Sequence, residues 1–177
     1  INKLSKKKLP GDGLITNIRG IPIGILTADC APILFFDPIK NIIGAVHSGW
    51  KGAYKKIGKK MISSFKKRGS RLNDIYAVIG PCISKNNYEV KKDFYSNFIS
   101  QSKQNEKFFI KKDNNSFKFN LRTYINEKFK DLGIQRIENI AVDSFASKNE
   151  YFSHRRAKKL GEDDYGRCIS TIRKTTL

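Results

Sequence analysis

The sequence is poor in the residues that mark secreted and membrane-spanning proteins. Its 177 residues include three cysteines, one methionine, one tryptophan and two histidines. Cys30, Cys82 and Cys168 are odd in number, far apart and without a Cys-x-x-Cys spacing, so they do not predict a disulfide scaffold. No apolar run approaches the roughly 20 residues that cross a bilayer. We therefore expect a cytoplasmic protein with no membrane partner.

Acidic residues are also scarce. The chain has 16 Asp and Glu against 35 Lys and Arg, a net charge of +19, and such an excess is typical of basic nucleic-acid-binding modules. Here the excess is mostly lysine, spread in pairs such as Lys55–Lys56 and Lys66–Lys67, whereas reading of duplex bases relies on clustered arginine. A basic nucleic-acid-binding module stays an alternative, and sequence-specific binding is not expected.

The chain begins at Ile1, without an initiator methionine or the apolar core of a signal peptide. We expect an upstream N-terminal segment to be missing from the sequence. A chain of this length fits one domain and hides about two thirds of its unfolded surface. Residues 1–177 are therefore interpreted as a single domain that is monomeric or weakly self-associating.

Short β-rich runs dominate the first half of the chain. They span residues 21–26, 33–36, 42–46 and 75–79, with breaks at Pro32 and at the Asp37–Pro38 turn. The second and third runs are expected to form a hairpin. From Gly52 to Gly69, apolar residues step by three and four while lysines fill the other face, which predicts one amphipathic helix.

The second half alternates in the same way. A helical period covers residues 90–98, and Asn120 is expected to cap a further helix that ends at Gly133. The polar segment 101–118 is interpreted as an excursion or hairpin, with strand character at Phe108–Phe109 and Phe117–Phe119. Late strands are expected at 137–142 and 168–172. The pattern predicts a single α+β domain with a mixed β-sheet.

Two residues with reactive side chains stand at the ends of neighbouring predicted strands. Cys30 precedes Ala31–Pro32 at a point where the chain must turn, and His47 closes the strand 42–46. A strand, a turn and a strand separate them, so we expect the two side chains to meet. Cys30 and His47 could instead have only structural roles, because cysteine is often buried and a histidine at a strand end is often only hydrogen-bonded.

A meeting of Cys30 and His47 would serve either of two chemistries. Thiolate and imidazole are ligands that zinc prefers, and a catalytic zinc takes about three protein ligands and keeps one position for water. Alternatively, His47 acts as the base for a nucleophilic Cys30, as in metal-free Cys–His hydrolases and amidases. Spacing alone leaves both chemistries open.

The turn that follows His47 is a candidate phosphate-binding segment. It joins a strand to a predicted helix, and its glycines allow backbone N–H groups to approach an anion. Lys51 adds a positive charge. Trp50 either stacks on a nucleobase or covers the edge of the core. The candidate residues are Ser48, Gly49, Trp50, Lys51 and Gly52.

A second basic segment lies near the C-terminus. Arg155 and Arg156 follow two aromatic residues and the second histidine, His154. Either arginine is a candidate contact for an anionic substrate group. The alternative is a surface pair that the acidic residues at 162–164 neutralise. Cys82, in the turn after the strand 75–79, is interpreted as structural.

Several motifs occur in the order found in one known protein family. They are the segments 27–32 (TADCAP), 47–52 (HSGWKG), 79–82 (IGPC), 120–122 (NLR), 152–156 (FSHRR) and 165–167 (YGR). By these motifs the chain resembles the YfiH-like, laccase-domain purine nucleoside phosphorylases, also called polyphenol oxidase or peptidoglycan-editing-factor proteins. The resemblance runs from about Asp12 to Ile172.

The resemblance implies a fold, an activity and a metal. The fold is a single-domain α/β/α-type sandwich with a mixed sheet. The activity is phosphorolysis of purine nucleosides (adenosine, inosine, guanosine and methylthioadenosine) to the base and ribose 1-phosphate, with adenosine deamination as a companion. The metal is zinc, with copper as an alternative, held by one Cys and two His. Cys30 and His47 match two of these ligands.

The chain departs from the family pattern in three places. The third ligand belongs to a Gln-x-His segment upstream of Asp12, where this sequence has no histidine. We expect that ligand in the missing segment, and His154 is the only substitute within the chain. Asn120 stands where Asp is common, and Lys51 where Arg is common. Lysine keeps the charge without the bidentate fork of arginine, so the preferred nucleoside stays open.

Overall fold

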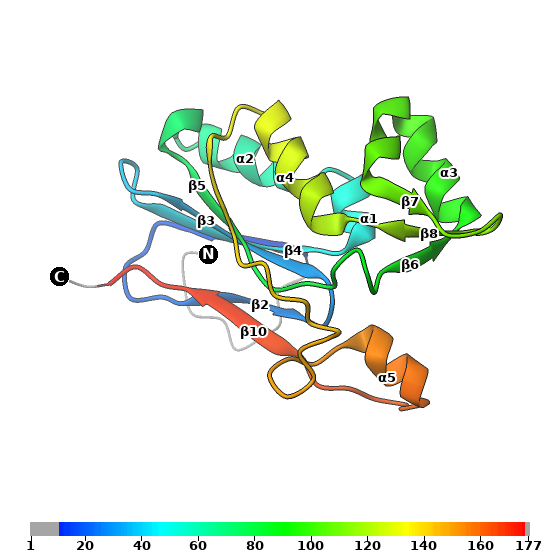
Figure 1. Ribbon diagram of the computed structural model, residues 1–177. Helices are drawn as coiled ribbons and strands as arrows, with labels where there is room; N and C mark the ends of the chain where they lie inside the picture. Colours follow the sequence, from blue (N-terminus) through cyan, green and yellow to red (C-terminus); the bar gives the residue numbers. More distant parts are fainter. Residues whose placement is uncertain (1–10, 176–177) are drawn as a thin grey trace.

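The computed structural model describes residues 11–175, and its centre is a mixed five-stranded sheet (Figure 1). The strand order is β1-β4-β3-β5-β9. Only the β5–β9 pair is parallel, and the pairs that join β1, β4, β3 and β5 are antiparallel. The strands are β1 (Gly13–Thr16), β3 (Ala31–Asp37), β4 (Ile42–Ser48), β5 (Tyr76–Ile79) and β9 (Arg136–Asn139).

Helices cover one face of this sheet (Figure 1). They are α1 (Trp50–Tyr54), α2 (Ile57–Lys66) and α4 (Leu121–Asp131). Phe35 of β3 is fully buried between the rings of Phe65 and Phe129, with centroid distances of 6.0 and 5.5 Å. A Cβ on Gly44 would lie 2.8 Å from the ring of Phe65. Glycine therefore allows α2 to pack closely on β4.

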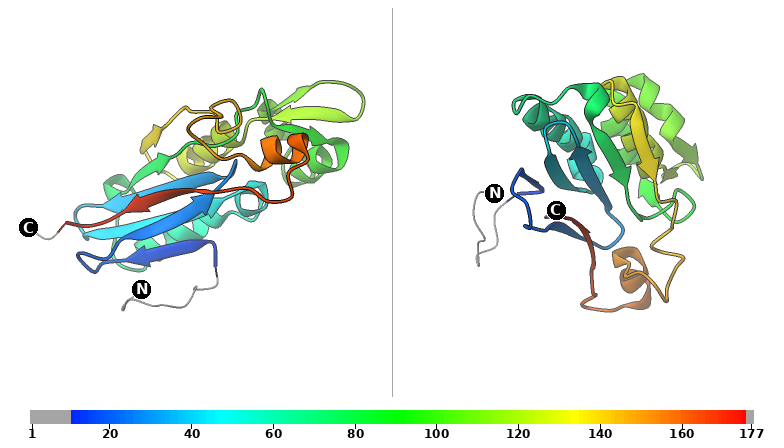
Figure 2. Two further views of the ribbon diagram at one scale, coloured as in Figure 1. Left: turned by 90° about the horizontal axis from the view of Figure 1, so that it is seen from below. Right: turned by 90° about the vertical axis from the view of Figure 1, so that its left-hand side faces the viewer.

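A two-stranded sheet covers the opposite face, as Figure 2 shows in its view from below. It consists of β2 (Ile23–Thr27) and β10 (Cys168–Ile172), which pair antiparallel. Its inner side chains pack on β4: Ile23, Ile25, Ile43 and Ala45 form a second buried cluster. Neighbouring residues of β4 thus point into different cores, because side chains alternate along a strand.

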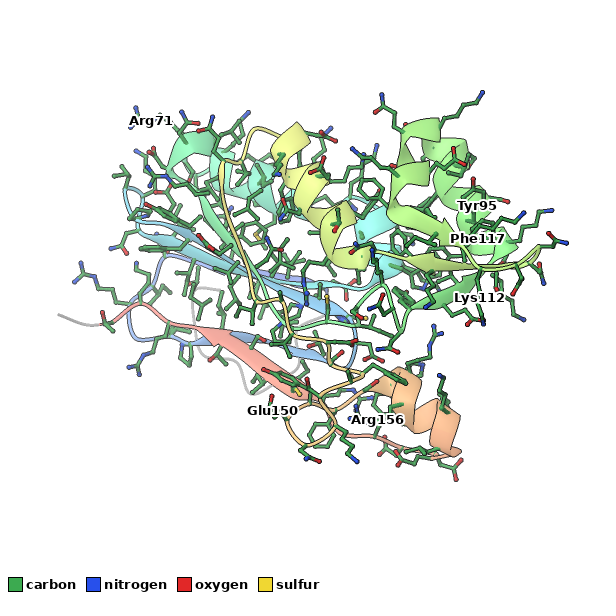
Figure 3. The ribbon with its side chains drawn as sticks, viewed as in Figure 1. Arg71, Tyr95, Lys112, Phe117, Glu150 and Arg156 are labelled. Atoms are coloured by element: carbon green, nitrogen blue, oxygen red, sulfur yellow. The ribbon has the colours of Figure 1, made fainter. Side chains whose placement is uncertain are left out.

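A third, three-stranded sheet lies beside α3 (Lys92–Gln101) and supports an aromatic cluster. Its strands are β6 (Glu89–Lys91), β8 (Ser116–Phe119) and β7 (Phe109–Lys111), in the order β6-β8-β7. Phe94 and Phe98 stack with centroids 4.9 Å apart, and Phe119 packs against both. At the surface, Tyr95 stacks on Phe117 with centroids 4.1 Å apart (Figure 3). Short 3₁₀ segments occupy Leu72–Asp74 and Lys103–Phe108.

The α+β class, the mixed sheet and most predicted elements are confirmed. The expected hairpin is β3–β4, the strand 75–79 is β5, the excursion contains the β7–β8 hairpin, and β10 spans residues 168–172. Asn120 caps α4 by accepting a hydrogen bond from the N–H of Thr123 at 3.2 Å. No helix within residues 11–175 is long and apolar enough to span a membrane.

Several expectations about elements are wrong. The single helix predicted from Gly52 to Gly69 is two helices, because Lys56 adopts the left-handed conformation (φ 58°) between α1 and α2. Val90 lies in β6, and the helix begins at Lys92. The strand expected at 137–142 is β9, which ends at Asn139. Neither β1 nor α5 (His154–Leu160) was predicted.

Candidate functional site

Cys30 and His47 approach one another at the same end of the β3–β4 hairpin. His47 is paired with Pro32 and Ser48 with Ala31, so Cys30, which directly precedes β3, lies opposite Gly49. A Cβ placed on Gly49 would lie 2.7 Å from the Cys30 sulfur and 3.9 Å from His47 Nε2. The two side chains therefore flank the same backbone position, as the spacing of the strands predicts.

Asp12 lies near the second ring nitrogen of His47. Because β1 pairs with β4, the N–H of His47 donates to the Asp12 carbonyl at 2.8 Å, and Asp12 Oδ1 lies 3.8 Å from His47 Nδ1. Nδ1 thus lies near a carboxylate, while Nε2 and the Cys30 sulfur both lie near the position of Gly49. Sequence reasoning missed Asp12 because β1 was not predicted; the short apolar run after Gly13 was the available signal.

Burial controls the chemistry of the two thiols near this point. It raises the pKa of Cys30 to about 11, and the charges of Asp29, Cys82 and Asp12 add to that effect. Burial also raises the pKa of Cys82 to about 11, although Arg122 acts in the opposite direction. The Cys82 side chain is fully buried, and Arg122 Nη2 lies 3.5 Å from its sulfur. This environment agrees with a structural role for Cys82.

Asp29 connects the Cys30 turn to the C-terminal segment. Its backbone is left-handed (φ 78°), a conformation that few non-glycine residues adopt. Its carboxylate accepts hydrogen bonds from Ser144 Oγ at 2.8 Å, Ser153 Oγ at 3.0 Å and the N–H of Arg155 at 2.7 Å. Asp29 therefore fixes the start of α5 beside Cys30. Sequence reasoning missed this role, because its partners lie more than 110 residues away.

The two arginines of α5 have different surroundings. Arg156 donates to the carbonyl oxygens of Ser144, Phe145 and Tyr151 and points into its own loop (Figure 3). The guanidinium of Arg155 donates one hydrogen bond within the described residues, to the Glu89 carbonyl at 2.8 Å, and lies 5.4 Å from the Tyr88 ring.

Arg155 is therefore the better placed of the two for an anion. Neither arginine forms a salt bridge with the acids at 162–164 in the described part of the chain. Within residues 11–175, the structure therefore shows no pairing of Arg155 or Arg156 with the acidic residues at 162–164.

The residues of the predicted phosphate turn do not all face the Cys30–His47 pair. Ser48 is buried and points to the helix-covered face, because it follows His47 in the same strand. Trp50 packs on Phe94, with ring centroids 4.9 Å apart, at the edge of the core. Lys51 Nζ lies 5.5 Å from the Trp50 ring. α1 has five residues, so its start offers an anion little help from a helix dipole.

The donor set fits part of a metal site. Thiolate and imidazole are ligands of zinc and copper, and the absence of a side chain at Gly49 leaves space between them. Among residues 11–175, however, no group of three His, Cys, Asp or Glu side chains is arranged to hold a metal ion. His154, which packs on Tyr165 at 4.9 Å, does not complete such a group.

Known proteins share this sequence and this fold. The family described as multi-copper polyphenol oxidoreductase laccase matches residues 1–175. A protein of Rickettsia conorii named purine nucleoside phosphorylase is 34% identical over 162 residues, which cover 91% of this chain and 67% of that protein. A purine nucleoside phosphorylase of Borreliella burgdorferi is 36% identical over 84% of this chain and 65% of its own length.

Solved structures of other proteins have the same fold as this chain. The Bacillus licheniformis protein YfiH superposes with a TM-score of 0.85 at 30% identity, over 93% of this chain and 61% of that chain. YlmD from Geobacillus stearothermophilus gives the same TM-score and coverage at 24% identity, a likeness of fold. The chain thus spans 61–67% of the length of these relatives. By sequence and by fold, the chain belongs to the multi-copper polyphenol oxidoreductase laccase family.

Proposed function

We propose that this chain carries the active centre of a purine nucleoside phosphorylase, built around Cys30 and His47. The observation that carries the proposal is the approach of the Cys30 sulfur and His47 Nε2 to the same position at Gly49. Relatives that match most of the chain are named purine nucleoside phosphorylases. The proposed substrates are a purine nucleoside and inorganic phosphate.

Zinc is the proposed metal, with copper as the alternative. Cys30 and His47 would hold it through sulfur and Nε2, and a histidine upstream of Asp12 is the proposed third ligand. The Asp12 carboxylate lies 3.8 Å from Nδ1, and its proposed role is to orient the imidazole for binding through Nε2, as carboxylates do for metal-binding histidines in many proteins. Bound there, zinc supplies a Lewis acid that polarises a water or a substrate oxygen.

Phosphate is proposed to bind between α5 and residues 49–52, which form the cap and first residues of α1. Arg155 contributes a guanidinium that is only partly engaged by the protein, and Lys51 contributes a second positive charge. In phosphorolysis, a phosphate oxygen forms a bond to C1′ of the ribose while the bond from C1′ to the base nitrogen breaks. Two cations beside the nucleophile hold it in place and balance its charge.

The metal-free Cys–His hydrolase is a weaker candidate. A cysteine nucleophile acts as the thiolate and needs a lowered pKa, whereas burial and Asp29 raise the pKa of Cys30 to about 11. Adenosine deamination remains part of the proposal, because a zinc ion held by Cys30 and His47 would also supply the Lewis acid that activates water for deamination.

One incubation tests the proposal. The protein, loaded with zinc, is mixed with adenosine, inosine and phosphate, and the products are separated by chromatography. We expect hypoxanthine and ribose 1-phosphate to appear only with phosphate, and we expect Cys30→Ala to abolish turnover and lower the zinc content. Cys168→Ala is the matched control. Unchanged turnover and zinc content in Cys30→Ala would refute the proposal.

A further inference from the structure

A cavity of about 240 Å³ lies on the helix-covered side of the sheet. Its walls come from α1, α2, α4 and the 3₁₀ segment Lys103–Phe108, and Figure 1 shows α2 and α4 side by side above the strands. Apolar side chains form much of its lining: Ile33, Ala53, Ile125, Phe129 and Leu132. The cavity is thus a chamber between the sheet and its helices.

This cavity is separate from the Cys30–His47 centre. Ser48 lines it, whereas the preceding residue, His47, faces the other side of β4 toward Cys30. The sheet stands between the two places. A molecule held in the cavity therefore does not occupy the position proposed for the nucleoside.

Positive charge surrounds the cavity. Lys56, Lys59 and Lys128 line it, and Asp131 is the acidic residue among the lining side chains. Lys128 Nζ lies 3.4 Å from Asp131 Oδ2, whereas Lys56 and Lys59 have no salt-bridge partner in the part of the chain that the structure describes. Lys56 also has a left-handed backbone (φ 58°), and strain of this kind is concentrated at ligand sites.

A buried polar group marks the wall of the same cavity. Asn105 is 1% exposed, and its Nδ2 donates to the Phe98 carbonyl at 2.8 Å. Its Oδ1 is buried and accepts no hydrogen bond from the described residues. An unsatisfied acceptor in such a place destabilises the protein unless a donor reaches it. A ligand with an O–H or N–H group would supply that donor after a small rotation of the amide.

We propose that this cavity binds a small amphipathic anion: a molecule of about one ring in size, with a single carboxylate or phosphate and a hydroxyl or amine donor at its other end. The apolar walls would cover the ring, Lys56 and Lys59 would contact the anion, and Asn105 Oδ1 would accept from the donor. The volume is slightly below that of most drug-sized sites, which begin at about 300 Å³, and this limits the ligand to a small one.

Two matched compounds test the proposal on the intact protein. 4-Hydroxyphenylacetate has the ring, the anion and the donor, and tyramine has the same ring and donor with a cation instead. In an NMR titration of ¹⁵N-labelled protein, we expect 4-hydroxyphenylacetate to shift the amides of residues 58–60 and 101–105 saturably, and tyramine to leave them unchanged. Equal shifts with tyramine, or no saturable shift with 4-hydroxyphenylacetate, would overturn the proposal.

Two neighbouring lysines provide the matched variants. Lys59 lines the cavity and Lys60 does not, although both are exposed on α2. We expect Lys59→Gln to weaken binding of 4-hydroxyphenylacetate by about threefold to fivefold, the effect of one exposed charge pair, and Lys60→Gln to have no measurable effect. An equal effect of both variants would mean that the ligand responds to the net charge alone, which contradicts a site in this cavity.

Discussion

Oδ1 of Asp12 lies 3.8 Å from Nδ1 of His47, whereas Nε2 of the same imidazole lies near Gly49, a position that the Cys30 sulfur also approaches. The two ring nitrogens therefore have different neighbours, with a carboxylate near Nδ1 and the Gly49 position near Nε2. This relationship depends on β1, which pairs with β4 and places Asp12 at the level of His47.

Asp12→Asn is expected to weaken zinc binding by about tenfold, because carboxylates that face metal-binding histidines typically contribute that much. The backbone bond between the two residues would remain, so the thermal unfolding midpoint should stay within a degree or two of the wild type. Competition with a chromogenic chelator measures the affinity. Asp74→Asn, which removes only a surface pair with Arg71, is the control. Equal affinities of all three proteins would contradict the role given to Asp12.

Gly49→Ala tests the space between the two proposed ligands. The added Cβ would lie 2.7 Å from the Cys30 sulfur, so the thiol must move. Displacement of a reacting group by about 1 Å commonly lowers turnover by about 100-fold. We expect a loss of this order in the phosphorolysis assay, together with lower zinc content. Gly13→Ala is the control, because its Cβ would meet the flexible end of Met61 at 3.2 Å. Wild-type turnover of Gly49→Ala would show that Cys30 and His47 do not act together.

Asp29→Ala should lower the free energy of unfolding by about 2 to 4 kcal/mol, because three donors would lose a charged acceptor and alanine does not favour a left-handed backbone. Urea denaturation gives the value. Asn41→Ala, at another left-handed position, measures the backbone contribution alone, which we expect to be about 1 kcal/mol. If the two variants were equally destabilised, the hydrogen bonds of Asp29 would contribute nothing.

Because its thiol is buried, Cys82 should make the free energy of unfolding decrease at alkaline pH. Burial raises the pKa of its thiol from 9.0 to about 11 in the folded protein. Between these values the unfolded chain loses the proton first, so the stability that is present below pH 9 decreases as the pH rises toward 11. We expect the wild type to lose roughly 2 kcal/mol more over this range than Cys82→Ala. Parallel pH curves for the two proteins would contradict this account, and the range pH 6–8 provides the baseline.

The sequence predicted the elements whose signals are local. The apolar spacing of α2, the cap at Asn120 and the turn between β3 and β4 all depend on residues close together in the chain, and each was recognised. The approach of Cys30 and His47 was predictable for the same reason, because one hairpin joins them.

Features that depend on distant partners were not predictable. Asp29 bonds to residues 115, 124 and 126 positions away, and no sequence pattern records such pairs. β1 has four residues and owes its structure to pairing with β4. The break at Lys56 is also unmarked in the sequence, because a left-handed backbone is expected at glycine or asparagine rather than at lysine.

The register of β4 carries functional information. β4 is paired on both edges, with Gly13 opposite Val46 on one side and Ile33 opposite the same residue on the other. A slip of one position would turn His47 toward the helices and Ser48 toward Cys30, so the imidazole and the serine would exchange compartments without any change in composition. The hydrogen bonds from β1 and β3 thus fix the register of β4. They therefore determine that the His47 imidazole lies on the Cys30 side of the sheet and the Ser48 hydroxyl on the helix-covered side.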